Sequence, residues 1–390
     1  MGNINPKHDR KKIRVGVILG GRSGEHDVSL MSAQSVMSAL DPEKYEVVPI
    51  GITRSGRWIT GEVLAALNSG KSEVHPATLL PDPQSSALMQ VELQEMQPVG
   101  ISVVTELDVV IPILHGPYGE DGTVQGLLEL AGLPYVGAGV VGSAVGMDKA
   151  IFKYTMAAND IPVLPWMLVT TGDWAQRSPV IVHEIEDKLH YPLFTKPANL
   201  GSSVGISRCE NRAELVAGID EAIRYDRRIV IEQGINAREL EVAILGNDEP
   251  EASIVGEIRP RRGFYDYVAK YMAEPGSEDE SELLIPAEIS NELSGQVRAM
   301  AIRAYKAIDC AGMGRVDLML DKDSGKLYMN EINTIPGFTQ ISMYPKLWEA
   351  SGISYQELLD RLIVLSLERY NEKEGLETSL VNNENVIGQT

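Results

Sequence analysis

The segment 315–333 constrains the fold most, because it combines the pattern of a β-hairpin with polar side chains at alternate positions. Two apolar-rich runs, 315–321 and 327–332, flank a polar turn. A three-residue loop at 323–325, with Gly325 in the left-handed conformation, is a common way to close such a hairpin. The chain should therefore contain two antiparallel strands joined by this loop.

With that loop, Lys322 pairs with Lys326, and the alternation of side chains places four polar residues on one face of the hairpin. These four are Arg315, Asp317, Glu331 and Asn333, with Asp317 opposite Glu331 and Arg315 opposite Asn333. The other face carries Val316, Leu318, Leu320 and Ile332. A slip of one residue at the turn would move Glu331 to that apolar face.

The polar face of the hairpin offers two carboxylates and a carboxamide but neither His nor Cys. Opposed carboxylates repel each other, so a cation is expected between them. An oxygen-only ligand set favours Mg²⁺ over Zn²⁺, and Mg²⁺ completes its octahedron with water and substrate phosphates. We therefore expect a platform for Mg²⁺ and a nucleoside triphosphate. The alternative is a surface hairpin with a solvated polar face.

Composition excludes several classes of protein. The chain has 390 residues and a mass of 42.6 kDa, which predicts two or three domains. It contains no run of about 18 apolar residues, so we expect no membrane segment. The polar stretch 1–12 is expected to be a disordered leader. The net charge of −20 argues against nucleic-acid binding. Two distant cysteines, Cys209 and Cys310, predict no disulfide framework, and a reducing cytoplasm fits.

The first region, 1–138, has the pattern of an α/β domain with a parallel sheet. A continuous apolar run at 13–20 ends in a glycine-rich turn that leads into a helix, and a second strand is expected at 45–52. Residues 60–100 are predicted to be a helix plus a loop insertion. The strand expected at 108–114 ends at the sequence HGPYGEDG, in the position where ligand-binding loops of α/β proteins lie.

Two further regions are expected after the first. Residues 139–233 alternate helices with strands, and residues 234–372 contain antiparallel strands, a long helix and the hairpin. The polar tail 373–390 is expected to be disordered.

Candidate phosphate-binding groups lie in the second region. A strand ends at Lys196, and the loop GSSVG at 201–205 follows it. Small residues let backbone N–H groups approach a phosphate closely. Lys149, at a helix start, is a second candidate cation, although a lone helical lysine is commonly just solvated. A bend further on offers backbone groups for an adenine and carboxylates for ribose hydroxyls. Its residues are Glu232, Gln233, Ile235 and Glu239.

Seven motifs, in order along the chain, resemble those of the D-alanine–D-alanine ligase family in the ATP-grasp superfamily. They are GGRSGEHDVS, HGPYGEDG, GMDK, KPANLGSSVG, FYDYVAKY, GRVDLML and NEINTIPGFT, and the resemblance covers roughly residues 13–370. It implies a three-domain α/β ATP-grasp ligase with an N-terminal Rossmann-like (pre-ATP-grasp) parallel sheet domain. The central small domain would be 139–233 and the catalytic domain 234–372, in a chain that forms a homodimer.

The resemblance also implies roles for individual residues. Two Mg²⁺ ions, which Mn²⁺ can replace, would be held by Asp317, Glu331 and Asn333. ATP would contact Lys149, Lys196, Glu232, Gln233, Ile235, Glu239 and Lys270. The catalytic residues would be Glu25, Ser202, Tyr271, Arg315 and Gly337, and the pocket for D-alanine would include His115, Ser342 and Met343.

The implied activity is ATP-dependent synthesis of D-alanyl-D-alanine, a peptidoglycan precursor. The carboxylate of one D-alanine would attack the γ-phosphate of ATP, and the amine of a second would attack the resulting acyl phosphate. Three alternatives differ from this hypothesis. One is a D-alanine–D-lactate or D-serine ligase of the same fold, and another is a nucleotide-binding regulator without turnover. The third, a Rossmann dehydrogenase, is disfavoured because glycines at 20, 21 and 24 do not fit the dinucleotide fingerprint.

Overall fold

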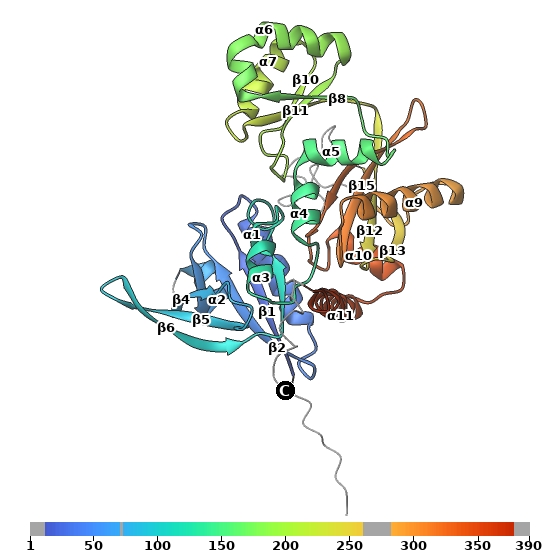
Figure 1. The fold of residues 1–390 in the computed structure, drawn as a ribbon. Helices are drawn as coiled ribbons and strands as arrows, with labels where there is room; N and C mark the ends of the chain where they lie inside the picture. The colour runs from blue at the N-terminus through green and yellow to red at the C-terminus, as the bar shows by residue number, and fades with distance from the viewer. Residues whose placement is uncertain (1–11, 71–72, 260–281, 378–390) are drawn as a thin grey trace, which may run out of the picture.

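The computed structural model describes residues 12–70, 73–259 and 282–377 of the chain. Within these residues the strands form three sheets, and each sheet is built from one continuous stretch of the chain's strand order (Figure 1). None of the helices in the described ranges is long and apolar enough to cross a membrane. The predicted leader falls almost wholly outside these ranges, as do residues 378–390 of the predicted tail.

The first sheet has seven strands in the order β6-β5-β4-β3-β2-β1-β7. Only β1, β2 and β7 pair in parallel, and the remaining neighbours are antiparallel. The strands are β1 (Ile13–Gly20), β2 (Tyr45–Ile52), β3 (Trp58–Gly61), β4 (Val74–Leu79), β5 (Ala87–Gln94), β6 (Gln97–Glu106) and β7 (Val109–Ile113). The helices of this part are α1 (His26–Ala39), α2 (Val63–Ser69) and α3 (Thr123–Leu130).

Of the helix plus loop insertion predicted at 60–100, the helix is present as α2, but the predicted loop is wrong, because β4, β5 and the start of β6 extend the sheet there. The edge strand β6 is mostly exposed on both faces, so it lacks the alternation of apolar and polar residues that marks a half-buried strand. Pro76 and Pro98 lie inside β4 and β6, where sequence reasoning expects loops.

The second sheet is fully antiparallel, in the order β10-β9-β11-β8. Its strands are β8 (Trp166–Thr170), β9 (Leu193–Pro197), β10 (Ser207–Cys209) and β11 (Arg228–Gln233). Helices α6 (Thr171–Lys188) and α7 (Arg212–Ala222) bury their apolar side chains against it. Before this sheet the chain forms α4 (Val140–Met147) and α5 (Lys149–Ala158).

The third sheet has the order β14-β13-β12-β15-β16 and is also antiparallel. Its strands are β12 (Ala237–Leu245), β13 (Glu251–Arg259), β14 (Glu282–Leu284), β15 (Met313–Asp321) and β16 (Leu327–Asn333). Helix α9 (Asn291–Ala307) packs on one face. The helices α10 (Met343–Ala350) and α11 (Tyr355–Glu374) follow, and α11 continues two residues past the predicted start of the tail.

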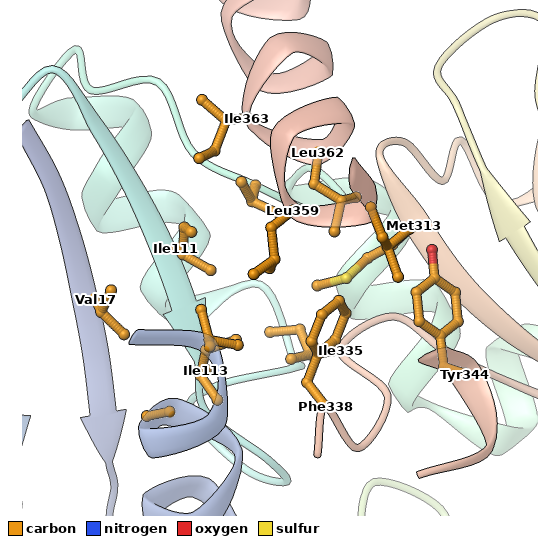
Figure 2. Close-up of a cluster of buried hydrophobic side chains, with 14 of the residues drawn as sticks. Val17, Ile111, Ile113, Met313, Ile335, Phe338, Tyr344, Leu359, Leu362 and Ile363 are labelled. Atoms are coloured by element: carbon orange, nitrogen blue, oxygen red, sulfur yellow. The ribbon is translucent and has the colours of Figure 1, made fainter. Parts of the chain in front are cut away.

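One hydrophobic core joins the first and third sheets. Figure 2 shows Val17 and Ile111 of the first sheet facing Leu359 of α11, with Met313 of the third sheet on the far side of that helix's apolar residues. In Figure 1, α11 accordingly lies between the two sheets. This shared core fixes the loops of the first sheet relative to the polar strands of the third.

The polar residues of the hairpin of β15 and β16 pair as predicted, but the turn that joins the two strands differs from the predicted one. Asp317 is opposite Glu331 and Arg315 is opposite Asn333, as predicted, and Gly325 is left-handed with φ 71°. Near the turn, however, Leu320 pairs with Leu327, so the predicted pairing of Lys322 with Lys326 is wrong by one residue. A β-bulge at Asn330 inserts one extra residue and restores the register.

Candidate active site

Three carboxylates lie in one row across the third sheet. Glu241 of β12 pairs with Asp317 of β15, which pairs with Glu331 of β16, so the three side chains leave the same face at one register position. Arg315 and Asn333 form the next row on that face. The third sheet therefore concentrates negative charge beside a single arginine.

Glu241 is a member of this row that sequence reasoning missed. It is only 4% exposed, and its neighbours in the strand, Leu240 and Val242, are buried on the opposite face. A carboxylate is rarely buried unless it is paired, so a Glu between Leu240 and Val242, at the start of the apolar half of β12, was the available signal. The same alternation puts Glu241 on the face of Glu239, which had been predicted to bind the nucleotide.

Arg315 neutralises part of the carboxylate row. Its Nε and Nη2 donate to Asp317 Oδ1 and Oδ2 at 2.8 and 2.6 Å, a two-point pairing that fixes the guanidinium plane. Its Nε also lies 3.1 Å from Glu241 Oε2. Asn333 Nδ2 donates to Asp317 Oδ2 at 3.0 Å. The Asp317 carboxylate is thereby held rigidly between an arginine and an amide.

The residues present suit a hard cation. Asp317, Glu331 and the Oδ1 of Asn333 form an oxygen-only donor set, which is the chemistry that Mg²⁺ takes. In the part of the chain that is described, no three His, Cys, Asp or Glu side chains converge into a complete metal cage. Mg²⁺ binds through one or two protein carboxylates and completes its shell with water and phosphate.

A buried cluster of charges lies within electrostatic reach of Glu331. Glu232 of β11 forms ion pairs with Lys196 of β9 and with Lys153 of α5, and all three side chains are at most 13% exposed. Burial alone would raise the pKa of the Glu232 carboxyl, but the two lysine charges outweigh burial and lower it to about 2. Burial lowers the pKa of Lys153, while the charges of Glu232 and Glu331 oppose that effect.

Lys153 is a second residue that sequence reasoning missed. It lies one helical turn after Lys149 on α5, so the two lysines share one face of that helix. Lys149 Nζ donates to the carbonyl of Leu200 at 2.6 Å, at the start of the GSSVG loop. The signal was the i, i+4 spacing of two lysines, one of them expected to bind phosphate.

We predict that Lys153→Met destabilises the fold. The change removes one of the two lysines that pair with the buried Glu232 and leaves the ion pair with Lys196. We expect a loss of up to about 3 kcal/mol in the free energy of unfolding, measured in urea at pH 7. Because the pKa of Glu232 is lowered in the fold, its contribution is complete above the ordinary value of 4.5 and is lost as pH falls toward 2. The difference between wild type and variant should shrink below pH 4.5. An equal difference at pH 7 and pH 3 would contradict this account.

The glycine-rich loops of the first two sheets meet at Glu25. Ser202 Oγ donates to Glu25 Oε1, and both Ser202 and Ser203 have left-handed φ angles of 52° and 58°. Gly116, whose Cα lies close to Glu25 Oε2, has a left-handed φ of 79°, a conformation that glycine adopts without strain. Left-handed non-glycine residues cost free energy and concentrate at functional sites. The role of the Glu25–Ser202 bond stays a prediction.

The segment after β16 brings together the residues predicted to bind D-alanine. His115 is 4% exposed, and its Nδ1 lies 3.0 Å from the carbonyl oxygen of Ile335, two residues before Gly337. A Cβ at Gly337 would lie 3.1 Å from Ser342 Oγ, so Ser342 flanks that glycine. Met343 is buried in the core shared by the first and third sheets.

The other residues predicted to bind ATP or to act in catalysis lie at the bend between the second and third sheets, on β12, or outside the described residues. The Gln233 side chain accepts a hydrogen bond from the backbone of His190 at 2.9 Å, and Ile235 is half-buried at the bend between the second and third sheets. Glu239 lies on β12, between β13 and β15. Lys270 and Tyr271 fall outside the described residues.

The chain combines lysines on α5 and β9, carboxylates on the third sheet, and a first sheet with a parallel part and glycine-rich loops. This arrangement places it in the ATP-grasp class, and the predicted fold class is confirmed. Two family models match it: "D-ala D-ala ligase N-terminus" at residues 14–138 and "D-ala D-ala ligase C-terminus" at residues 155–364. The chain belongs to the D-alanine–D-alanine ligase family.

Relatives agree over nearly the whole chain. A D-alanine–D-alanine ligase of Heliobacterium modesticaldum is 53% identical, over 93% of this chain and 97% of its own length. One from Natranaerobius thermophilus is 48% identical, with the same coverage. Among solved structures, the ligase of Coxiella burnetii superposes with a TM-score of 0.79 at 35% identity, covering 93% of this chain and 96% of that one. A D-Ala:D-Ser ligase of Enterococcus faecalis gives 0.79 at 36% identity, covering 91% and 100%.

Proposed function

We propose that the protein uses ATP to join two D-alanines into D-alanyl-D-alanine by way of D-alanyl phosphate, as a step in peptidoglycan precursor synthesis. The observation that carries this proposal is the carboxylate row of Glu241, Asp317 and Glu331, in which Glu331 lies close enough to the buried Lys153 for their charges to interact. Phosphoryl transfer needs positioning and charge neutralisation more than covalent help from the protein. The curated relatives that are 46–53% identical carry the same activity in their names.

The nucleotide would lie between the second and third sheets. The cluster carries one net positive charge, because two lysines, Lys153 and Lys196, pair with the single carboxylate of Glu232. Lys149 adds a second positive charge, so this part of the site favours a polyphosphate. The Ser/Gly loop after Lys196 offers backbone N–H groups to the same phosphates. The bend from Glu232 to Glu239, with the backbone of Gln233 and Ile235, would hold the adenosine, and Lys270 would complete the ATP contacts.

Asp317, Glu331 and Asn333 would hold two Mg²⁺ ions, or Mn²⁺ in their place. When bound, such ions neutralise the charge of the transferred phosphoryl group and orient it. Arg315 already lies beside Asp317 with its guanidinium plane fixed. It would stabilise the charge that develops on the transferred phosphoryl group and then on the tetrahedral intermediate.

The first D-alanine would lie near the Glu25–Ser202 hydrogen bond, with Tyr271 as a third member of that group. The second would lie beside His115, Ser342 and Met343. Its amine attacks the acyl carbon of D-alanyl phosphate, phosphate leaves, and the N–H of Gly337 with Arg315 would bind the oxyanion. Closure of the site against water protects the acyl phosphate from hydrolysis.

The decisive experiment measures ATP-dependent phosphate release with D-alanine as the sole amino acid, with the product identified by mass. We expect release of one phosphate for each D-alanyl-D-alanine formed. Because a solved relative at 36% identity is a D-Ala:D-Ser ligase, D-serine and D-lactate are tested alongside. Release that requires either of them would replace the substrate assignment, and no release with any of the three would refute the proposed ligase.

We further propose a homodimer in the cytoplasm, with the chain divided at 1–138, 139–233 and 234–372. The edge strand β6 supports the dimer: Val99, Ile101 and Val103 are 49–63% exposed, although such strands are normally protected from pairing. Antiparallel pairing of two β6 strands about Ile101 would place Val99 opposite Val103 of the partner subunit. Val103→Lys should shift sedimentation toward the monomer, and an unchanged dimer would exclude this edge as the interface.

A further inference from the structure

Ile335, just before Pro336-Gly337, has both of its backbone polar groups bound by side chains from the first part of the chain. Its N–H donates to Glu120 Oε1 at 3.3 Å, and its carbonyl oxygen accepts from His115 Nδ1 at 3.0 Å. Glu120 Oε2 also accepts from the N–H of Gly116 at 2.7 Å, so the Glu120 carboxyl spans two loops. Burial and the charge of Glu25 raise the pKa of Glu120 to about 8. Whether it is protonated or ionised, the Glu120 carboxyl presents one oxygen to the N–H of Gly116 and one to the N–H of Ile335.

Phe338, on the other side of Pro336-Gly337, is bound in the same way. Its N–H donates to Ser32 Oγ at 3.3 Å, and its carbonyl oxygen accepts from the hydroxyl of Tyr355 at 2.5 Å. The Tyr355 hydroxyl lies 3.1 Å from Ser35 Oγ, so α1 and α11 hold this residue together. Pro336 has no N–H, and the hydrogen bonds of the described residues include none donated by the N–H of Gly337.

The direction of the hydrogen bonds through His115 follows from its partners. A carbonyl oxygen can only accept, so His115 Nδ1 carries the proton that faces Ile335. Burial lowers the pKa of the imidazole, which keeps the ring neutral and makes Nε2 an acceptor. Ser32 lies 3.1 Å from Nε2 and donates to it, while its oxygen accepts from Phe338. Both ring nitrogens are therefore used in holding the chain.

We propose that Ser32, His115, Glu120 and Tyr355 form a clamp of positioning residues that fixes the Gly337 N–H for the attack of the second amine. Glycine has the freest backbone of all residues, so an oxyanion donor at Gly337 needs its neighbours to be held. The clamp holds Ile335 and Phe338 by their N–H and carbonyl groups alike. It rests on the proposed function, in which the Gly337 N–H binds the oxyanion.

The chain offers a matched pair of variants for testing the clamp. Ser32 and Ser29 are both fully buried on α1, one turn apart, and each accepts a backbone N–H and donates a hydrogen bond. Ser29 does so within the first sheet, between Gly20 and Ile113, whereas Ser32 reaches Phe338. Ser32→Ala and Ser29→Ala should therefore lose similar amounts of stability. Tyr355→Phe, which removes one hydroxyl from a half-buried ring, provides a second clamp variant if Ser32→Ala fails to fold.

Hydrogen exchange without substrates tests the clamp itself. The peptide spanning residues 335–339 should exchange at least about tenfold faster in Ser32→Ala and Tyr355→Phe than in wild type or Ser29→Ala.

Steady-state kinetics test whether the clamp contributes to the attack of the second amine. Both clamp variants should lower kcat by about 10- to 100-fold and raise KM for the second D-alanine, with KM for ATP unchanged, whereas Ser29→Ala should leave all three near wild type.

Each outcome bears on the proposal separately from the ligase assignment. Faster exchange with unchanged kinetics, or equal kinetic effects of Ser32→Ala and Ser29→Ala, would overturn the clamp. Unchanged exchange in both clamp variants would do the same. Failure of the wild-type enzyme to form D-alanyl-D-alanine would instead refute the proposed function, and the exchange result would then stand on its own as a statement about the fold.

Discussion

Glu331→Gln should reduce kcat by on the order of 10³-fold while leaving the fold intact. The amide keeps the shape of the side chain and one oxygen, but it removes the charge that a divalent cation needs. Glu331 is only partly buried and lies directly opposite Asp317. Removing one of three neighbouring carboxylates relieves repulsion in the absence of a metal, so the free energy of unfolding should be unchanged or slightly higher.

Asp323→Asn provides the matched control for this variant. It removes the same charge from the same hairpin, but Asp323 lies in the exposed turn, far along both strands from the carboxylate row. Steady-state phosphate release across a range of Mg²⁺ concentrations measures the effect. Glu331→Gln should require more Mg²⁺ for half-maximal activity, whereas Asp323→Asn should not. Near-normal turnover by Glu331→Gln would remove this hairpin from the metal site.

The hairpin illustrates how much of the site could be predicted from the sequence. The face of each strand is set by burial, because a slip of one residue would move Leu318 and Ile332 out of the core. That requirement is readable in the sequence, and it agrees with the pairing of Asp317 with Glu331, which the count from the turn predicts. The sequence does not predict the turn or the bulge at Asn330. The turn shifts the pairing by one residue and the bulge shifts it back, so the residues on each face stay the same.

The residues missed in the site are buried polar side chains with distant partners. Glu241, Lys153 and Glu120 each lie in an ordinary strand, helix or loop, and only tertiary contacts give them a role. Local pattern cannot supply those contacts, because it reports which face a residue occupies and not what lies across from that face. The strands at 74–106 were missed because burial is low there rather than because their contacts are distant. The edge strand β6 buries too few side chains to show an alternation of apolar and polar residues.

Arg315→Lys should lower kcat by about 10²- to 10³-fold despite keeping the positive charge. Lysine cannot reproduce the two-point contact with Asp317, at 2.8 and 2.6 Å, together with the contact to Glu241 at 3.1 Å. Its ammonium is a mobile point charge, so it cannot hold a donor plane toward the transferred phosphoryl group. Arg315→Ala should be worse still, because it removes both the guanidinium donors and the positive charge that pairs with Asp317 and Glu241.

The same sheet supplies a matched control for Arg315→Lys. Arg238 of β12 makes an equivalent two-point pair with Glu257, at 2.8 and 2.6 Å, on the face covered by α9. Arg238→Lys should lose comparable stability in urea and keep kcat within about threefold of wild type. If both lysine variants lowered kcat equally, the effect of Arg315 would be one of sheet stability. A large loss confined to Arg315→Lys, with KM for ATP little changed, is the result expected of a group that acts on the transition state rather than on bound ATP.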